Sequence, residues 1–501
     1  MNTKDNIVYT ACKKLAKKLI LPTITLLSAS FCAFSAHADE LDQWVVELMQ
    51  KRNIPGLQLA VVRDNKVTKV ASYGVANIED NTAVDGNTLF AINSATKAFV
   101  GVALMQLVEQ KKLDLNAPIG TYLPELPTEW HAITTRELMS HTSGLPDIIK
   151  GEVADLISDQ GPDDAWQLVQ TKPLEFETGT RFKYNQTNYV IIGKLINKLS
   201  GMPFQQFIEK NQLQQAEMSR TLEAGFNNLN NAVKHSARRY ENQGDELFNS
   251  REAIFSEMLQ TAAGMASTAA ELANWLIALQ TNQFISEDSI QQMWTPTRLK
   301  SGHTQGFNQR LNGYSLGWPV MDREEHPALA AVGGNRAGIF VYPEDNMSIV
   351  ILTNLMGAMP SQFVDEIAGF YIPEMKQENG FGLPKNIKRL WQVLEVQGYE
   401  NAIVAADQLS KEKKIQFAEN DINLWGYSLI NQDKLNEALA VFKLNTHLYP
   451  NSYNTFDSLA EAYWYLGNLK QAIANYNQVL KLKPDNAHAK KQLAKLAELT
   501  Q

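Results

Sequence analysis

The feature of this sequence that most limits its fold is a repeat near the C-terminus, where residues 419–452 align with residues 453–486 at a period of 34. A small residue lets two antiparallel helices approach, an aromatic residue fills the groove between them, and a proline ends the second helix. The pattern therefore predicts stacked helical hairpins rather than strands. The paired positions are Gly426 with Ala460, Leu435 with Leu469, Ala438 with Ala472, Phe442 with Tyr476, and Pro450 with Pro484.

This pattern resembles the tetratricopeptide repeat. Residues 385–410 look like a degenerate earlier helix pair that turns at Gly398, and residues 487–501 look like the polar capping helix that solenoid ends require. We favour a true repeat over coincidental helical patterning because the matches recur over two periods. The resemblance implies a linker and first helix at 376–395, then helical repeats over 396–501 that can bind another protein.

Residues 39–375 mix short β-rich runs with helical stretches, which predicts an α+β domain. Residues 57–62 and 66–73 are β-rich runs separated by a polar turn, which is typical of a hairpin. Residues 338–342 and 348–353 form a second pair around a turn that begins with proline. Because strands occur near both ends, we expect an antiparallel sheet with an inserted helical subdomain.

Residues 1–38 predict an export signal. A lysine cluster at 13–18 precedes an apolar run at 19–34, and Ala36-His37-Ala38 follows as the small-x-small pattern of a cleavage site. The apolar run is short for a membrane span, so we favour cleavage before Asp39 over a retained anchor. We therefore expect a periplasmic or secreted protein without a transmembrane span after cleavage.

Charge and cysteine content exclude several function classes. Residues 39–501 hold 41 Lys and Arg against 53 Asp and Glu, a net charge of −12, which would be repelled by the phosphates of a nucleic acid. Cys12 and Cys32 both lie in the expected signal, so the mature chain would have no disulfide, thiolate metal site or cysteine nucleophile. Zinc-protease and phosphate-loop motifs are absent, and we expect no metal and no cofactor.

Ser94 and Lys97 form an S-x-x-K pair just before an apolar helical pattern at 98–111. Residues three apart share one face of a helix. A buried lysine has its charged form disfavoured, so it can accept the serine proton, and the helix N-terminus favours developing negative charge. The spacing alone is a weak signal, because Ser410 and Lys413 also match it. A plain helix cap at Ser94 is the alternative.

The surroundings of this pair resemble the serine β-lactamase-related hydrolases, which include class C β-lactamases, D-Ala-D-Ala carboxypeptidases, D-aminopeptidases and esterases. The resemblance covers residues 41–372 and implies a β-lactamase/transpeptidase-like fold with an acyl-enzyme formed at Ser94. The matching segments are LFAINSATK at 89–97, ITTRELMSHTSGL at 133–145, AAGMAST at 262–268, YSLGW at 314–318 and ILTN at 351–354.

The family's second motif, Tyr-x-Asn, has its best match at residues 184–186. The resemblance implies that Tyr184 exchanges a proton with Ser94 and with the leaving group, while Lys97 polarises its hydroxyl. Gln186 replaces the family's asparagine and moves the amide one methylene outward. Asn188 is close enough in sequence to compensate for this change.

The third motif, Lys- or His-x-Gly, aligns with residues 331–333. Ala331 stands where the basic residue is expected, and Arg336 is the cation nearby in the sequence. The resemblance implies that Gly333 and Gly334 lie against the substrate. It also implies that the N–H groups of Gly334 and Ser94 together form an oxyanion hole.

These residues predict an exported serine hydrolase that acts on a small ester, amide or peptide-like substrate. A cation would be needed to bind a carboxylate substrate, so an esterase or amidase is favoured over a β-lactamase or a D-Ala-D-Ala carboxypeptidase acting on cell-wall peptides. A catalytically inactive binding protein with a docking module is the other alternative, and the retained catalytic motifs argue against it. His141 of the HTSGL segment is expected to be a structural turn residue.

Overall fold

The computed structural model describes residues 33–149, 161–226, 233–243, 246–250 and 256–499. The chain divides into two compact units, residues 1–45 and 46–501. The first unit is described only from the start of helix α1 (Ala33–Arg52) onward. Most of the expected export signal, including both cysteines, lies outside the described residues.

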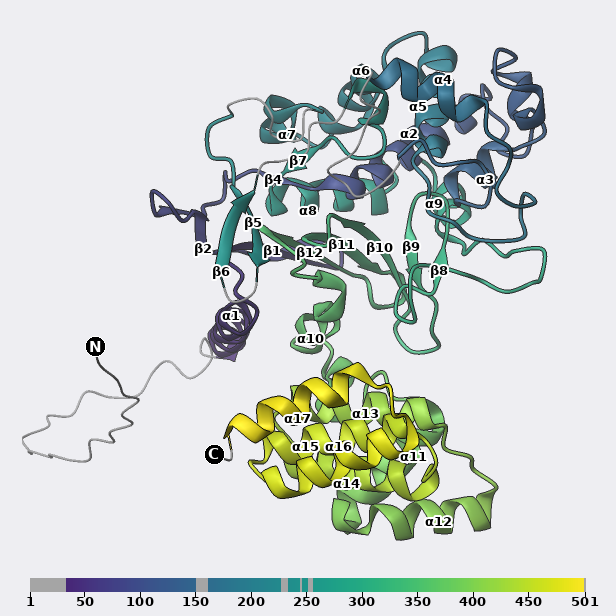
Figure 1. Ribbon diagram of the computed structural model, residues 1–501. Helices are drawn as coiled ribbons and strands as arrows, with labels where there is room; N and C mark the ends of the chain where they lie inside the picture. Colours follow the sequence, from purple (N-terminus) through teal and green to yellow (C-terminus); the bar gives the residue numbers. More distant parts are fainter. Residues whose placement is uncertain (1–32, 150–160, 227–232, 244–245, 251–255, 500–501) are drawn as a thin grey trace, which may run out of the picture. The chain divides into compact units, whose positions relative to one another are not determined.

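The second unit is built on an eight-stranded antiparallel sheet with the strand order β3-β2-β1-β12-β11-β10-β9-β8 (Figure 1). The first long strand lies beside the last one, because Leu57 of β1 is opposite Thr353 of β12. The prediction of an antiparallel sheet with inserted helices is confirmed. The strands are β1 (Gly56–Arg63), β2 (Lys66–Asn77), β3 (Thr82–Ala83), β8 (Gly313–Tyr314), β9 (Pro319–Met321), β10 (Ala328–Gly333), β11 (Ala337–Tyr342) and β12 (Met347–Thr353).

Both predicted hairpins form, and their turns show why. Asp64 and Asn65 have φ angles of 48° and 58°, which is the pair of left-handed conformations that a two-residue type I′ turn requires. Asn346, with φ of 48°, precedes β12 in the same conformation. Asparagine and aspartate adopt this conformation more readily than other residues with a side chain. These local preferences form the two turns, and a β-bulge between Val61 and Val62 then shifts the register of β1 with β2.

The central strands are buried along their length, since every residue of β11 and β12 is buried. Figure 1 shows helices α8 and α10 on opposite faces of the sheet, and both contact β12. A strand that is covered on both faces has a continuously apolar sequence, and β12, with the sequence MSIVILT, shows this pattern. The bounds of the two helices are α8 (Ala269–Gln280) and α10 (Val364–Gly369).

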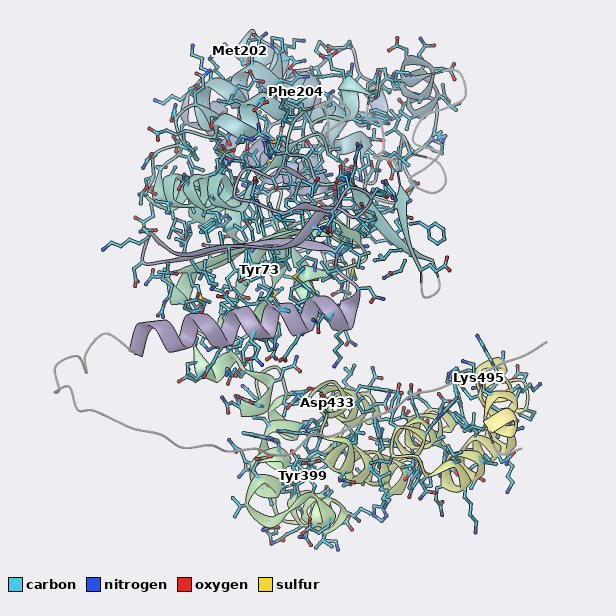
Figure 2. The ribbon with its side chains drawn as sticks, turned by 90° about the vertical axis from the view of Figure 1, so that its left-hand side faces the viewer. Tyr73, Met202, Phe204, Tyr399, Asp433 and Lys495 are labelled. Carbon is cyan, nitrogen blue, oxygen red and sulfur yellow. The ribbon has the colours of Figure 1, made fainter. Side chains whose placement is uncertain are left out.

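The helical subdomain is inserted between the two halves of the sheet, and Met202 and Phe204 mark it in Figure 2. Helix α2 (Thr96–Glu109) is buried from Thr96 to Leu107, so it is the central helix of this region. Its other helices are α3 (Thr135–Met139), α4 (Pro162–Gln170), α5 (Thr187–Ser200), α6 (Phe204–Ile208), α7 (Ser219–Ala224) and α9 (Glu287–Trp294). The short strands are β4 (Phe90–Ala91) paired with β7 (Ala266–Ser267), and β5 (Arg239–Gln243), β6 (Glu246–Ser250) and β13 (Leu355–Met356) in a second small sheet.

The tail consists of helical hairpins, as the 34-residue period predicts. The early pair turns at Gly398, whose φ of 87° suits glycine. A β-carbon on Gly426 would lie 2.4 Å from the ring of Phe442, so the small residue makes room for the aromatic one. No described helix is long and apolar enough to cross a membrane. The tail helices are α11 (Lys385–Gln397), α12 (Ala402–Lys413), α13 (Glu419–Asn431), α14 (Leu435–Leu448), α15 (Tyr453–Tyr465), α16 (Leu469–Leu482) and α17 (Ala487–Leu499).

Candidate active site

Ser94 lies in a short 3₁₀ helix, Asn93–Ala95, that leads directly into α2 (Thr96–Glu109). Asn93 adopts a left-handed conformation with φ of 47°, which turns the chain sharply after β4. Its side-chain oxygen accepts a hydrogen bond from Nε of Arg336 at 3.0 Å. Ser94 is therefore held at the N-terminal end of a buried helix, as the sequence predicts.

Lys97 is 1% exposed, and its Nζ donates to Oε1 of Gln186 at 3.0 Å and to the carbonyl oxygen of Ala262 at 2.6 Å. The same nitrogen lies 4.8 Å from the ring centroid of Tyr184. Burial lowers the pKa of Lys97 well below its usual value, and the charge of Asp147 opposes this only in part. Burial therefore favours the neutral amine over the charged ammonium.

Tyr184 precedes α5, and its side chain lies beside that of Ser94. Burial raises the pKa of Tyr184 to about 12, against the opposing effect of hydrogen bonding with the Ser94 and Gln186 side chains. The phenol is therefore protonated at neutral pH, so it can donate or relay a proton but cannot act as a resting base. The Gln186 side chain hydrogen-bonds both Lys97 and Tyr184. Gln186 therefore connects the first motif with the second.

The end of β10 lies directly against the 3₁₀ helix of Ser94. A β-carbon on Gly333 would lie 1.9 Å from the carbonyl oxygen of Ile92, a distance that no side chain tolerates. Gly334 has φ of 56°, and a β-carbon there would lie 2.9 Å from Oδ1 of Asn93. Glycine is therefore required at both positions for this close approach.

A pocket of about 220 Å³ opens beside Ser94, and we call it the Ser94 pocket. Four of the six predicted site residues line it, while Lys97 and Gln186 bond each other next to it. The remaining walls come from three stretches of chain. The full lining is Ser94, Tyr184, Phe307, Asn308, Leu311, Val332, Gly333, Gly334, Asn335, Ala337, Met359, Pro360 and Ser361.

Among the residues that the structure describes, no charged side chain lines the Ser94 pocket. Ala331 is 2% exposed and packs in the hydrophobic core, while its neighbour Val332 borders the pocket. Arg336 is also 2% exposed and its Nε bonds Asn93, so it does not take the place of the missing base. Within the described ranges, no group of three His, Cys, Asp or Glu side chains is placed to hold a metal.

His141 is fully buried and packs against the site from within the core. Its Nδ1 accepts the backbone N–H of Asn185 at 3.1 Å, and its ring centroid lies 4.4 Å from that of Tyr184. Burial lowers the pKa of His141 well below its usual value. The residue is a packing partner of Tyr184, in agreement with the structural role expected from the sequence.

Asn188 does not compensate for Gln186, contrary to the possibility raised by the sequence. Its side chain is buried, with Oδ1 accepting from Ser143 Oγ at 2.7 Å and Nδ2 3.1 Å from Nδ1 of His141. On helix α5, residue 188 faces the core, whereas Gln186 lies at the start of the helix beside Lys97. Gln186 itself supplies the amide of the second motif.

Two groups of the site could not be identified from the sequence. Oδ1 of Asp147 accepts the backbone N–H of Gln186 at 3.1 Å and so orients the residue that bonds Lys97. The carbonyl oxygen of Ala262 is the second acceptor for Lys97. A backbone carbonyl and a carboxylate in a loop belong to no motif, so only the tertiary structure identifies them.

A family model described as Beta-lactamase matches residues 41–371, and one described as Tetratricopeptide repeat matches residues 454–486. Protein flp of Staphylococcus aureus (strain N315) is 25% identical over 334 residues, which are 66% of this chain and 65% of that protein. The chain thus spans 65% of the length of this curated relative.

Two solved structures are similar in fold. EstCE1, a hydrolase with promiscuous acyltransferase activity, is 20% identical with a TM-score of 0.57, covering 67% of this chain and all of that one. The D-amino acid amidase from Ochrobactrum anthropi SV3, complexed with L-phenylalanine, is 19% identical with a TM-score of 0.56, covering 68% of this chain and 99% of that one. At these identities the similarity concerns the fold alone.

Proposed function

The chain belongs to the β-lactamase family, and on this premise we propose that it is a serine hydrolase that forms an acyl-enzyme at Ser94 with an ester or amide substrate. The observation that carries the proposal is the burial of Lys97 between two oxygen acceptors, Oε1 of Gln186 and the carbonyl oxygen of Ala262. A neutral amine has two N–H groups and one lone pair, and Lys97 donates to two carbonyl oxygens. The lone pair is then the part of the amine left to accept a proton.

In the proposed reaction, Ser94 Oγ attacks the substrate carbonyl and its proton passes through the Tyr184 hydroxyl to Nζ of Lys97. The proton then returns through Tyr184 to the departing oxygen or nitrogen as the bond from that atom to the carbonyl carbon breaks. Water hydrolyses the acyl-enzyme by the same route in reverse. The pKa of Tyr184, raised to about 12 by burial, supports a relay role because the phenol keeps its proton between steps.

The negative charge of the tetrahedral intermediate needs hydrogen-bond donors. The backbone N–H groups of Ser94 and Gly334 are our candidates, because the end of β10 lies against the 3₁₀ helix that carries Ser94. Donors of this kind lower the barrier because they are aimed in advance at the position where charge develops.

Uncharged substrates are favoured over carboxylates. The lining of the Ser94 pocket has no cation among the described residues, and Arg336 is buried against Asn93. A charge-assisted hydrogen bond contributes roughly 1.5–3 kcal/mol, so a carboxylate substrate would bind about tenfold to a hundredfold more weakly without it. An ester or amide hydrolase is therefore our first proposal, and a β-lactamase or D-Ala-D-Ala carboxypeptidase is the second.

Covalent labelling tests this function. Intact-mass analysis should show one fluorophosphonate adduct on the wild-type protein and none on Ser94→Ala, which assigns the label to Ser94. Lys97→Met and Tyr184→Phe should each slow labelling by orders of magnitude because the groups act as a unit. Substrate turnover should be faster for neutral aryl esters than for penicillins.

Two results would contradict the proposal. Absence of labelling and of turnover in the folded wild-type protein would favour the catalytically inactive binding protein. Faster turnover of penicillins than of aryl esters would favour the β-lactamase alternative. A thermal unfolding curve for each variant, matched to the wild-type curve, serves as the folding control.

We also propose that the protein is exported and that its tail binds another protein. Export rests on the sequence of residues 1–38, and docking rests on the match of residues 454–486 to the tetratricopeptide repeat. In repeats of this kind each hairpin contacts mainly its neighbours, which leaves an extended surface for a partner.

A further inference from the structure

Two walls of the Ser94 pocket come from segments without strands or α-helices. Phe307, Asn308 and Leu311 belong to the connection before β8, and Met359 and Pro360 belong to the connection between β13 and α10. The second wall is held by its own backbone, because Pro360–Gln362 forms a 3₁₀ helix and the N–H of Met359 donates to the carbonyl oxygen of Asn335 at 2.8 Å. The first wall has no strand or helix, so other contacts must keep it beside Ser94.

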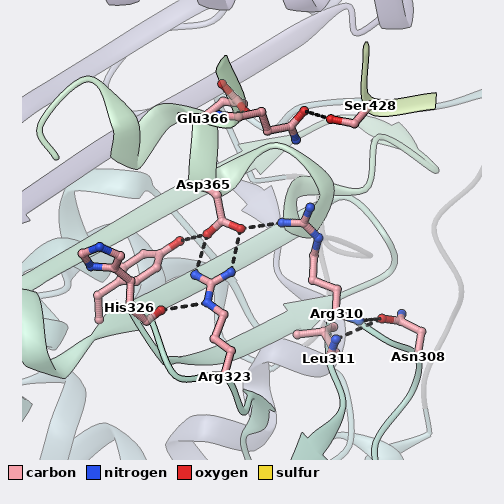
Figure 3. A network of polar contacts seen from close by, with 10 residues as sticks. Asn308, Arg310, Leu311, Arg323, His326, Asp365, Glu366 and Ser428 are labelled. Carbon is pink, nitrogen blue, oxygen red and sulfur yellow. Dashed lines mark hydrogen bonds and ion pairs between the residues drawn. The ribbon is translucent and has the colours of Figure 1, made fainter. Parts of the chain in front are cut away.

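The first wall is a compact turn closed by Asn308. Oδ1 of Asn308 accepts the backbone N–H groups of Arg310 and Leu311, both at 2.9 Å. From this turn the Arg310 side chain extends to α10, where its Nη1 donates to Oδ2 of Asp365 at 2.5 Å (Figure 3). This contact ties the first wall to the helix that follows the second wall.

Asp365 is well placed to anchor both walls. It is 3% exposed and lies four residues after Ser361, the last residue of the second wall. Arg323 donates to both of its oxygens at 2.9 Å, and the Tyr342 hydroxyl donates to Oδ1 at 2.9 Å. Burial acts to raise the pKa of Asp365, but the hydrogen bonds and charges of the two arginines outweigh burial and hold this pKa below its usual value.

We propose that Arg310 is a positioning residue for substrate specificity: its ion pair with Asp365 holds Phe307 and Leu311 as the wall of a pocket for an uncharged, apolar acyl group. This inference rests on the proposed hydrolase function. Phe307 is 42% exposed and its ring centroid lies 5.0 Å from that of Tyr184, so an acyl chain bound at Ser94 would cover it. Removing this exposed ring from water favours apolar chains.

The two arginines on Asp365 provide a matched pair of variants. Arg310→Met removes the cation that carries the pocket wall and leaves Asp365 paired with Arg323. Arg323→Met removes the other cation, which follows β9 and does not line the pocket. Arg310 donates through one nitrogen, so Arg310→Lys should restore the contact.

The measurement is the ratio of kcat/KM for p-nitrophenyl hexanoate to that for p-nitrophenyl acetate. In Arg310→Met we expect this ratio to fall about tenfold, through a higher KM for the hexanoate, because the wall is correctly placed for only part of the time. Arg310→Lys should keep the ratio near the wild-type value. Arg323→Met should lower the unfolding temperature and leave the ratio unchanged.

An equal change in the ratio for Arg310→Met and Arg323→Met, or no change in either, would overturn the inference and leave Arg310 a purely structural residue. Binding of uncharged N-hexanoylglycinamide to a Ser94→Ala protein, with and without Arg310→Met, gives a second measurement that needs no turnover. Weaker binding in the double variant supports the inference even if the wild-type protein hydrolyses nothing, which would refute the proposed function. Equal binding in both proteins refutes the inference.

Discussion

At the scale of single residues, the chemistry of the site depends on the protonation of Lys97. Its pKa is lowered by burial, and the acceptors around Nζ are the neutral oxygens of Gln186 and Ala262. In the proposed mechanism only the neutral amine accepts a proton from Ser94. The rate should therefore rise as the pH increases through the pKa of Lys97, and no fall from ionisation of Tyr184 is expected until near its pKa of about 12.

Changing Gln186 to glutamate should move this pH dependence. A carboxylate at the position of the amide, 3.0 Å from Nζ, favours the charged lysine and raises its pKa. The rising limb of the kcat/KM profile should shift to higher pH by the same amount. Gln186→Asn is the control, because it restores the family's residue without adding charge, so its limb should stay in place. Equal shifts in both variants would show that Lys97 is not the group that titrates.

At the scale of elements, the site depends on the contact between β10 and the 3₁₀ helix that carries Ser94. The two segments approach so closely that a β-carbon on Gly333 would collide with the carbonyl oxygen of Ile92. Any side chain there must push the strand end away from the helix. The candidate oxyanion donor Gly334 would move with the strand end.

We therefore expect Gly333→Ala to lower kcat about a hundredfold or more, the effect typical of losing one oxyanion donor. The unfolding temperature should also fall, because the new methyl group meets backbone atoms that cannot move aside. Gly86→Ala is a suitable control, since a β-carbon there has no neighbour within 4 Å. Steady-state kinetics and thermal unfolding of both variants measure the two effects. Wild-type kinetics in Gly333→Ala would disprove the role assigned to this contact.

At the scale of the whole molecule, the pairing of β1 with β12 joins the N-terminal and C-terminal strands into one sheet, and the helical subdomain lies between them in the sequence. Ser94 follows β4, Tyr184 precedes α5 and Gly333 ends β10, so three distant parts of the chain meet in one pocket. The order of the motifs along the chain therefore says little about how far apart they lie. This assembly needs no disulfide, since the only cysteines of the chain, Cys12 and Cys32, precede the described residues.

The absence of cysteine after residue 32 suits an exported protein. We expect the N-terminal sequence of protein recovered from the periplasm or the medium to begin at Asp39, after Ala36-His37-Ala38. Replacing Ala38 with a bulky residue such as Phe should block cleavage, and Ala33→Phe is a control outside the small-x-small pattern. A protein recovered from the cytoplasm with Met1 intact would contradict export.

Local patterns in the sequence determined much of this protein. The hairpins at Asp64-Asn65 and before Asn346 and the S-x-x-K pair at the start of α2 depend on residues close together in the sequence, and the helical repeats recur at a fixed period of 34. Backbone preferences and hydrophobic periodicity act over such short distances, so the sequence alone reveals them. The spacing of Ser94 and Lys97 and the glycines at 333 and 334 are features of this kind.

Only the tertiary structure decided where several side chains point and what they bond. Arg336 bonds Asn93 and does not line the pocket, and Asn188 bonds Ser143 in the core. The wall at Phe307 is held through the ion pair of Arg310 with Asp365. These contacts join segments far apart in the sequence, several of them loops without periodicity. Which side chains meet in these contacts depends on how the sheet assembles and how the side chains pack, and no local sequence pattern encodes this.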